Sequence, residues 1–254
     1  MTSSQKDISF PTKILITAIL GIYLFYLCLV SYTPVSADST GYEELAKMLL
    51  SGNWKEYFLT GPNREPLYPL FVAGHMAIAQ ALNTDYIFIL KVVQCMIILV
   101  VFWIVYHLML RFKTPRGVAC IISFYLIVSP SIIVSALIIY SEIITYPIIL
   151  GLVYCFYKLS QSLNRPAVAP VLLFSFLTTI FFLALTSVKA ITEYIFYGFF
   201  LIYFIFFISS LFKKIRNGKM FLRNVCLFLL ISSVLYFSLI HTYKYLNFRN
   251  NGTY

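Results

Sequence analysis

Long apolar stretches without charged side chains constrain this sequence more than any other feature. Eight stretches lack Asp, Glu, Lys and Arg: Ile14–Ala37, Pro66–Thr84, Val92–Leu110, Gly117–Ser141, Ile143–Tyr157, Pro166–Val188, Tyr194–Phe212 and Asn224–Tyr243. A membrane-crossing helix needs about 20 mostly apolar residues, because each adds about 1.5 Å across a hydrocarbon core of about 30 Å. Only 11% of the residues are charged, against about a quarter in soluble domains. We therefore expect an all-α, polytopic membrane protein, and neither a soluble enzyme nor a disordered chain.

The stretch Pro66–Thr84 is the doubtful span, because lipid tolerates polar residues such as His75, Gln80 and Asn83 poorly. Without it, seven spans remain, the N-terminus is cytoplasmic and 12 of the 19 basic residues lie inside. These inner residues are Lys6, Lys13, Arg111, Lys113, Arg116, Lys158, Arg165, Lys213, Lys214, Arg216, Lys219 and Arg223. If Pro66–Thr84 does span, every later loop changes side and the positive-inside rule is broken. We therefore predict about seven spans and an interfacial or re-entrant segment.

The net charge of +10 follows this topology. With 12 basic residues and Asp7, the cytoplasmic side carries +11, and the remaining 7 basic and 8 acidic residues leave the outer face at −1. The basic excess therefore indicates orientation and not a nucleic-acid partner. The outer acids are Asp38, Glu43, Glu44, Glu56, Glu65, Asp85, Glu142 and Glu193. Since the span interiors lack acids and bases, we expect chemistry at the outer surface.

The first outer loop, about residues 33–86, begins with a helical pattern. After Asp38, apolar residues recur at helical spacing: Tyr42, Leu45, Ala46, Leu49 and Leu50. This pattern predicts an amphipathic helix on the membrane surface, which Gly52 would end. Asp38 has two interpretations: it caps this helix, with Thr40 and Glu43 at capping-box spacing, or it is a general base beside the lipid headgroups.

The loop also resembles a known family. Residues 38–46 and 51–54 (DSTGYEELA and SGNW) resemble the first outer loop of GT-C-type membrane glycosyltransferases, notably the protein O-mannosyltransferase and lipid A aminoarabinose transferase group. Residues 64–70 (REPLYPL) resemble the stretch before that family's second span, and weaker matches lie at 140–142 and 185–189. The resemblance implies one GT-C-like transmembrane domain over residues 1–254. Relatives usually have more spans and a C-terminal outer domain, so a C-terminal part could be missing.

The resemblance implies transfer of a sugar from a polyprenyl-phosphate carrier to a lipid, glycan or protein acceptor on the outer face. Asp38 would be the catalytic base and Glu142 a second acid of the active site or a partner for Lys189. The cations that would bind the donor phosphate are Arg64, Lys91 and Lys189, for which interfacial snorkelling is the alternative. The residues that would contact substrate are Tyr42, Glu65, Tyr68 and His75; for His75, packing is the alternative.

No cofactor is required by this reaction, and no metal-ligand spacing is present in the sequence. Binding of a divalent ion by Asp38 and Glu142 remains an alternative, since some GT-C enzymes use such an ion. We expect an integral protein of the cell envelope, in a bacterial inner membrane, with its active site outside and membrane lipids as further partners. The rival interpretations are a transporter or flippase, and an inactive truncated assembly subunit.

Overall fold

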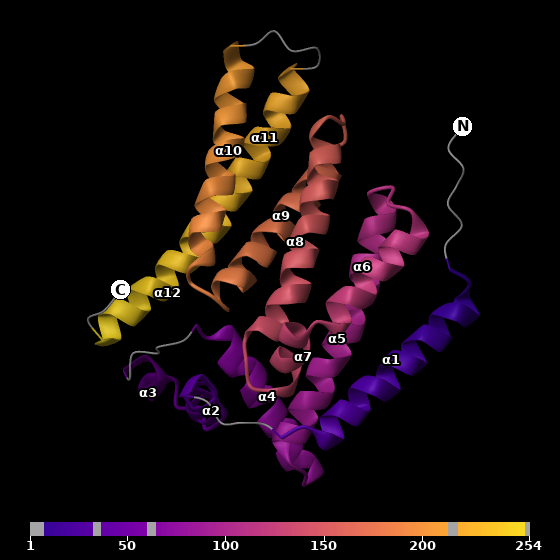
Figure 1. The fold of residues 1–254 in the computed structure, drawn as a ribbon. Coiled ribbons are helices and arrows are strands. Elements are labelled where there is room, and N and C mark those ends of the chain that lie inside the picture. Colours follow the sequence, from indigo (N-terminus) through magenta and orange to yellow (C-terminus); the bar gives the residue numbers. More distant parts are fainter. Residues whose placement is uncertain (1–7, 33–36, 60–64, 213–217, 252–254) are drawn as a thin grey trace. The chain divides into compact units, whose positions relative to one another are not determined.

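The computed structural model describes residues 8–32, 37–59, 65–212 and 218–251, and these residues form helices and no strand (Figure 1). In chain order the elements are α1 (Phe10–Val30), α2 (Ala37–Leu50), α3 (Trp54–Leu59), α4 (Leu67–Leu82), α5 (Tyr86–Arg111), α6 (Arg116–Val128), α7 (Pro130–Leu137), α8 (Glu142–Leu163), α9 (Val168–Thr186), α10 (Thr192–Phe212), α11 (Gly218–Ser232), the π-helix η1 (Ser233–Phe237) and α12 (Ser238–Asn251). The predicted all-α class is confirmed.

Six helical segments of the described chain are long and apolar enough to cross a membrane, and a bent pair would make seven. The six are α1, α5, α8, α9, α10 and the continuous segment Lys219–Asn250, which contains η1. The pair is α6 and α7. The protein is thus an integral multi-pass membrane protein, with a span number that agrees with the predicted seven when the pair counts as one span.

Helix α4 occupies the stretch that we predicted not to span. It has 16 residues, so at 1.5 Å per residue it covers about 24 Å, less than a hydrocarbon core of about 30 Å. The charge-free stretch therefore forms a helix that is too short to cross the membrane completely.

The sequence did not reveal the break between α6 and α7. The stretch Gly117–Ser141 was predicted as one span, but the two helices meet at a bend of 50°. Pro130, the first residue of α7, has no amide proton to continue the α6 ladder, and Ser129 before it is extended with ψ 122°. Proline is therefore the cause of the bend.

The chain divides into two compact units. The N-terminal unit comprises Met1–Gly52 and Tyr68–Leu150, and in it α5 packs against α1, α6 and α7. Among the contacts that join α1 to α5, the indole of Trp103 donates to Thr17 Oγ1 over 3.0 Å, and the sulfur atoms of Cys28 and Cys95 lie 3.2 Å apart.

The C-terminal unit comprises Asn53–Leu67 and Gly151–Tyr254. Helix α9 packs against α11, and α10 packs against both. The side-chain amide of Asn224 donates to Leu163 O and Arg165 O, which holds the turn after α8 against α11. A methyl group on Gly151 would lie 2.5 Å from the ring of Phe181, so glycine allows α8 and α9 to pack closely.

The π-helix η1 interrupts the last span within this unit. Tyr236 lies in it, fully buried, and its hydroxyl forms a 2.8 Å hydrogen bond with Thr186 Oγ1 at the end of α9. Its ring stacks on Phe196 of α10, with 3.6 Å between centroids. Since single π turns often occur at functional sites, this end of the unit is a candidate site.

Candidate functional sites

Helix α2 carries the residues on which the predicted active site depends. Asp38 is exposed in its first turn, where a carboxylate is favoured by the helix dipole. Because the described helix already includes Ala37 and Asp38, neither Asp38 nor Thr40 is its N-cap, and the capping-box interpretation is wrong. Gly52 ends the turn after α2 with φ 73°, as predicted, a conformation in which glycine has no steric penalty.

Tyr42, one turn beyond Asp38, links α2 to the start of α8. Its buried hydroxyl donates to Ser141 Oγ over 3.1 Å, and Ser141 directly precedes Glu142, the first residue of α8. Its ring meets Tyr68 edge to face at 4.7 Å. Three separate segments of the resemblance, 38–46, 64–70 and 140–142, thus contribute residues to one cluster of the N-terminal unit.

Tyr68 is fully buried, and its hydroxyl donates to Gln94 Oε1 over 3.0 Å. Burial, together with nearby Tyr42 and Glu142, raises the pKa of Tyr68 well above its usual value, so this phenol stays a neutral donor. Gln94, also fully buried, donates in turn to Ala136 O and Ile138 O at the end of α7, each over 3.0 Å. Gln94 thereby fixes both Tyr68 and the chain that leads to Glu142; sequence reasoning missed it.

Two other predicted site residues of this unit have structural partners. Lys91 is buried and its ammonium donates to Ser31 O over 2.8 Å and to Ser31 Oγ over 3.3 Å, at the C-terminal end of α1. His75 is buried, its Nδ1 lies 2.6 Å from Phe71 O, and its ring lies 4.4 Å from that of Phe71. These contacts fit helix capping for Lys91 and packing for His75; their binding roles stay predictions.

The C-terminal unit contains a cavity of about 360 Å³. Its lining residues come from the segment before α4, the end of α9, the turn to α10, the start of α10 and α12: Glu65, Pro66, Leu183, Thr186, Ser187, Ala190, Glu193, Leu239, Ile240, Tyr243, Lys244 and Asn247. The backbone fixes the first segment, because Leu67 N donates to Ser187 O over 3.0 Å. This volume falls within the range of small-molecule sites.

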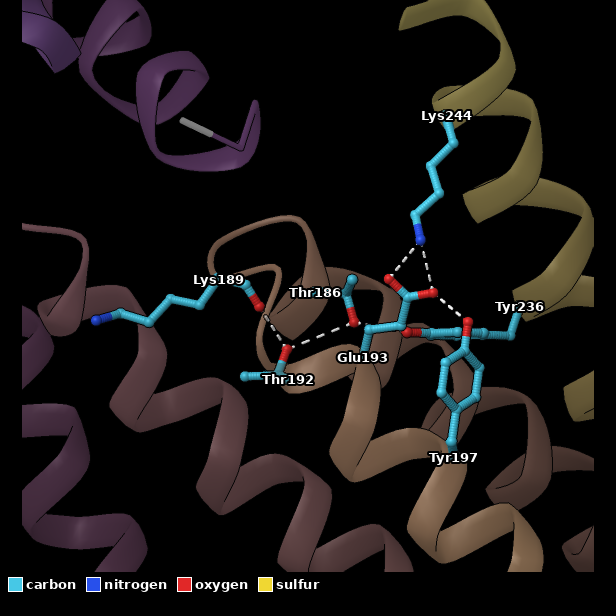
Figure 2. Close-up of polar contacts among 7 residues, drawn as sticks. All are labelled: Thr186, Lys189, Thr192, Glu193, Tyr197, Tyr236 and Lys244. Carbon is cyan, nitrogen blue, oxygen red and sulfur yellow. Dashed lines mark hydrogen bonds and ion pairs between the residues drawn. The ribbon is translucent and has the colours of Figure 1, made fainter. Parts of the chain in front are cut away.

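An ion pair lies in the cavity wall (Figure 2). Lys244 Nζ lies 2.8 Å from Glu193 Oε2 and 2.9 Å from Oε1, and the hydroxyl of Tyr197 donates to the same carboxylate. Beside it, Thr192 Oγ1 donates to Lys189 O over 2.8 Å, which closes the turn between α9 and α10. Glu193 and Lys244 stand 51 positions apart, so sequence reasoning missed the pair.

The predicted site residues divide between the units. Glu65 lines the cavity, while Lys189 lies in the turn beside it with its side chain extended away from the Glu193 carboxylate in Figure 2. Arg64 lies outside the described residues.

Burial of Tyr57 in α3, together with nearby Tyr243 and Glu65, raises the pKa of its phenol above the usual value.

Comparisons of this chain with protein-family models, with curated proteins and with solved structures find no match.

Proposed function

We propose that this protein is a polyprenyl-phosphate-sugar-dependent glycosyltransferase of the GT-C type. The observation that carries the proposal is the contact from Tyr42 to Ser141, which brings the helix of Asp38 to the residue before Glu142. A surface helix that carries an exposed carboxylate is thereby joined to the start of a span that carries a second carboxylate.

In the proposed reaction, the Asp38 carboxylate takes the proton of an acceptor hydroxyl as its oxygen attacks the anomeric carbon. The bond from that carbon to the phosphate oxygen breaks, and polyprenyl phosphate leaves with the bonding electrons, inverting the anomeric centre. Cations would stabilise the developing phosphate charge; of the predicted Arg64, Lys91 and Lys189, Lys91 belongs to the same unit as Asp38. Glu142 would orient the acceptor, and Tyr68, held by Gln94, would support this side of the site.

We place this site on the outer face of a cell membrane, with the N-terminus in the cytoplasm, because that orientation puts 12 of the 19 basic residues inside. A donor on a polyprenyl carrier reaches the site from the bilayer and its acceptor arrives from outside.

A transporter or flippase is the second candidate, and the broken span favours it. Interrupted helices form substrate sites in many transporters, and α6 and α7 are such a pair, bent by 50°. The C-terminal end of α7 is held by the neutral side chain of Gln94, however, which carries no charge to couple to transport.

Transfer of radiolabelled sugar from polyprenyl-phosphate donors into membrane acceptors tests the proposal. Asp38→Asn should lower the rate at least about 100-fold, the usual contribution of a general base. Glu44→Gln changes an exposed acid of the same helix and should transfer at the wild-type rate. Equal rates for wild type and Asp38→Asn would refute the assignment of Asp38.

A further inference from the structure

The cavity of the C-terminal unit has a charge imbalance, which centres on Glu65, a residue that the sequence predicted to contact substrate. Two carboxylates, Glu65 and Glu193, and one ammonium, Lys244, line it. Lys244 contacts both oxygens of Glu193. That carboxylate is only 10% exposed and accepts a further hydrogen bond from Tyr197. The pair is therefore neutralised within the wall, and the formal charge left for a ligand is that of Glu65.

Glu65 is half-buried, and over the described residues its carboxylate forms no hydrogen bond and no ion pair. Tyr243 lines the same cavity as Glu65. A carboxylate beside an aromatic ring is the combination that recognises ammonium groups, through a charged hydrogen bond and attraction to the ring face. The polar side of the cavity thus suits a cation.

Apolar side chains also line the cavity, among them Leu183, Leu239 and Ile240. The cavity lies where the apolar helix α9 ends and α10 begins, which is a boundary between hydrocarbon and water in a membrane-spanning chain. A lipid at this boundary can present its headgroup to the polar lining residues and its glycerol and first methylenes to the apolar ones.

We propose that this cavity binds the ammonium group of an ethanolamine headgroup, with Glu65 as its counter-ion and Tyr243 beside it. The group can come from an ethanolamine phospholipid or from a soluble ethanolamine compound. The inference concerns ligand occupancy and does not rest on the proposed sugar transfer.

Native mass spectrometry of the purified full chain tests this inference, with phosphatidylethanolamine, phosphatidylglycerol or phosphoethanolamine added. Wild type should bind the ethanolamine lipid more tightly than the glycerol lipid. Glu65→Gln should weaken that binding about tenfold or more, because a charged hydrogen bond is lost. Glu44→Gln, an exposed acid outside the cavity, should bind like wild type.

Ala190→Phe fills the cavity from an exposed lining position and leaves its charges intact; it should weaken binding as well. Displacement of the lipid by phosphoethanolamine would assign recognition to the headgroup alone, and no displacement to the whole lipid; either supports the site. Equal binding of the two phospholipids would overturn the inference. So would unchanged binding by folded Glu65→Gln or by folded Ala190→Phe.

Discussion

Replacing Gln94 by leucine should destabilise the N-terminal unit and the candidate active site together. Leucine keeps the approximate volume, but three hydrogen bonds are lost: from Tyr68 and to the carbonyl groups of Ala136 and Ile138. Side-chain hydrogen bonds in membrane proteins contribute about 0.6 kcal/mol on average and up to about 1.7 kcal/mol. For three bonds we expect the free energy of unfolding to fall by about 2–5 kcal/mol.

The assay is reversible unfolding of the detergent-solubilised chain by SDS. Gln80→Leu, at an exposed position of α4, is the matched control and should change the free energy by less than about 0.5 kcal/mol. Tyr68→Phe should cost about 0.6–1.7 kcal/mol alone, and less in the Gln94→Leu background, because both changes remove the same bond. A Gln94→Leu protein within about 0.5 kcal/mol of wild type would refute the network.

Three further changes test other parts of the molecule. Glu193→Gln breaks the ion pair with Lys244 and should lower the free energy of unfolding by about 1.5–3 kcal/mol, since hydrogen bonds to a charged group are lost; thermal melts measure it. Gly52→Ala places a Cβ at φ 73° and should cost about 1–2 kcal/mol, measured in the same melts. Single cysteines at Glu56 and Lys113, in a chain without native cysteines, should react with an impermeant maleimide in intact cells only at position 56.

For each of these three predictions, a control and a contradicting outcome can be stated. For Glu193→Gln, combination with Lys244→Met should recover part of the loss, and no loss in the single variant would mean that the ion pair does not stabilise the fold. For Gly52→Ala, the control is Gly41→Ala, inside α2 with open space around it, which should be neutral or stabilising. For the cysteines, labelling of position 113 from outside would reverse the proposed orientation.

The sequence was sufficient for the features that depend on local composition. Charge-free length located the spans, polar residues and the positive-inside rule predicted that the stretch of α4 does not cross, and Gly52 was predicted to end the helix of Asp38. Each is a property of a few consecutive residues, readable from hydropathy and backbone preference. The bend at Pro130 was readable in principle from the proline, but apolar length alone had joined α6 and α7.

The contacts that form the candidate active site and the cavity wall could not be predicted from the sequence. Gln94 is one neutral residue in an apolar run, and its partners become visible only when α4 and the end of α7 pack beside α5. Lys244 pairs with Glu193 across 51 positions, and charge counting cannot identify such a partner. From the sequence we predicted Asp38, Tyr42, Tyr68 and Glu142 as site residues. The hydrogen bond from Tyr42 to Ser141 that links their segments is visible only in the structure.

The central claim, sugar transfer with cleavage of a polyprenyl-phosphate donor, is tested most directly by its stoichiometry. The purified chain in liposomes is incubated with a polyprenyl-phosphate sugar and a hydroxyl acceptor, and free polyprenyl phosphate and glycosylated acceptor are quantified by mass spectrometry. The account predicts equal molar amounts of both products from wild type and at least about a 100-fold lower rate from Asp38→Asn. Movement of the intact donor across the bilayer, without release of polyprenyl phosphate, would contradict it.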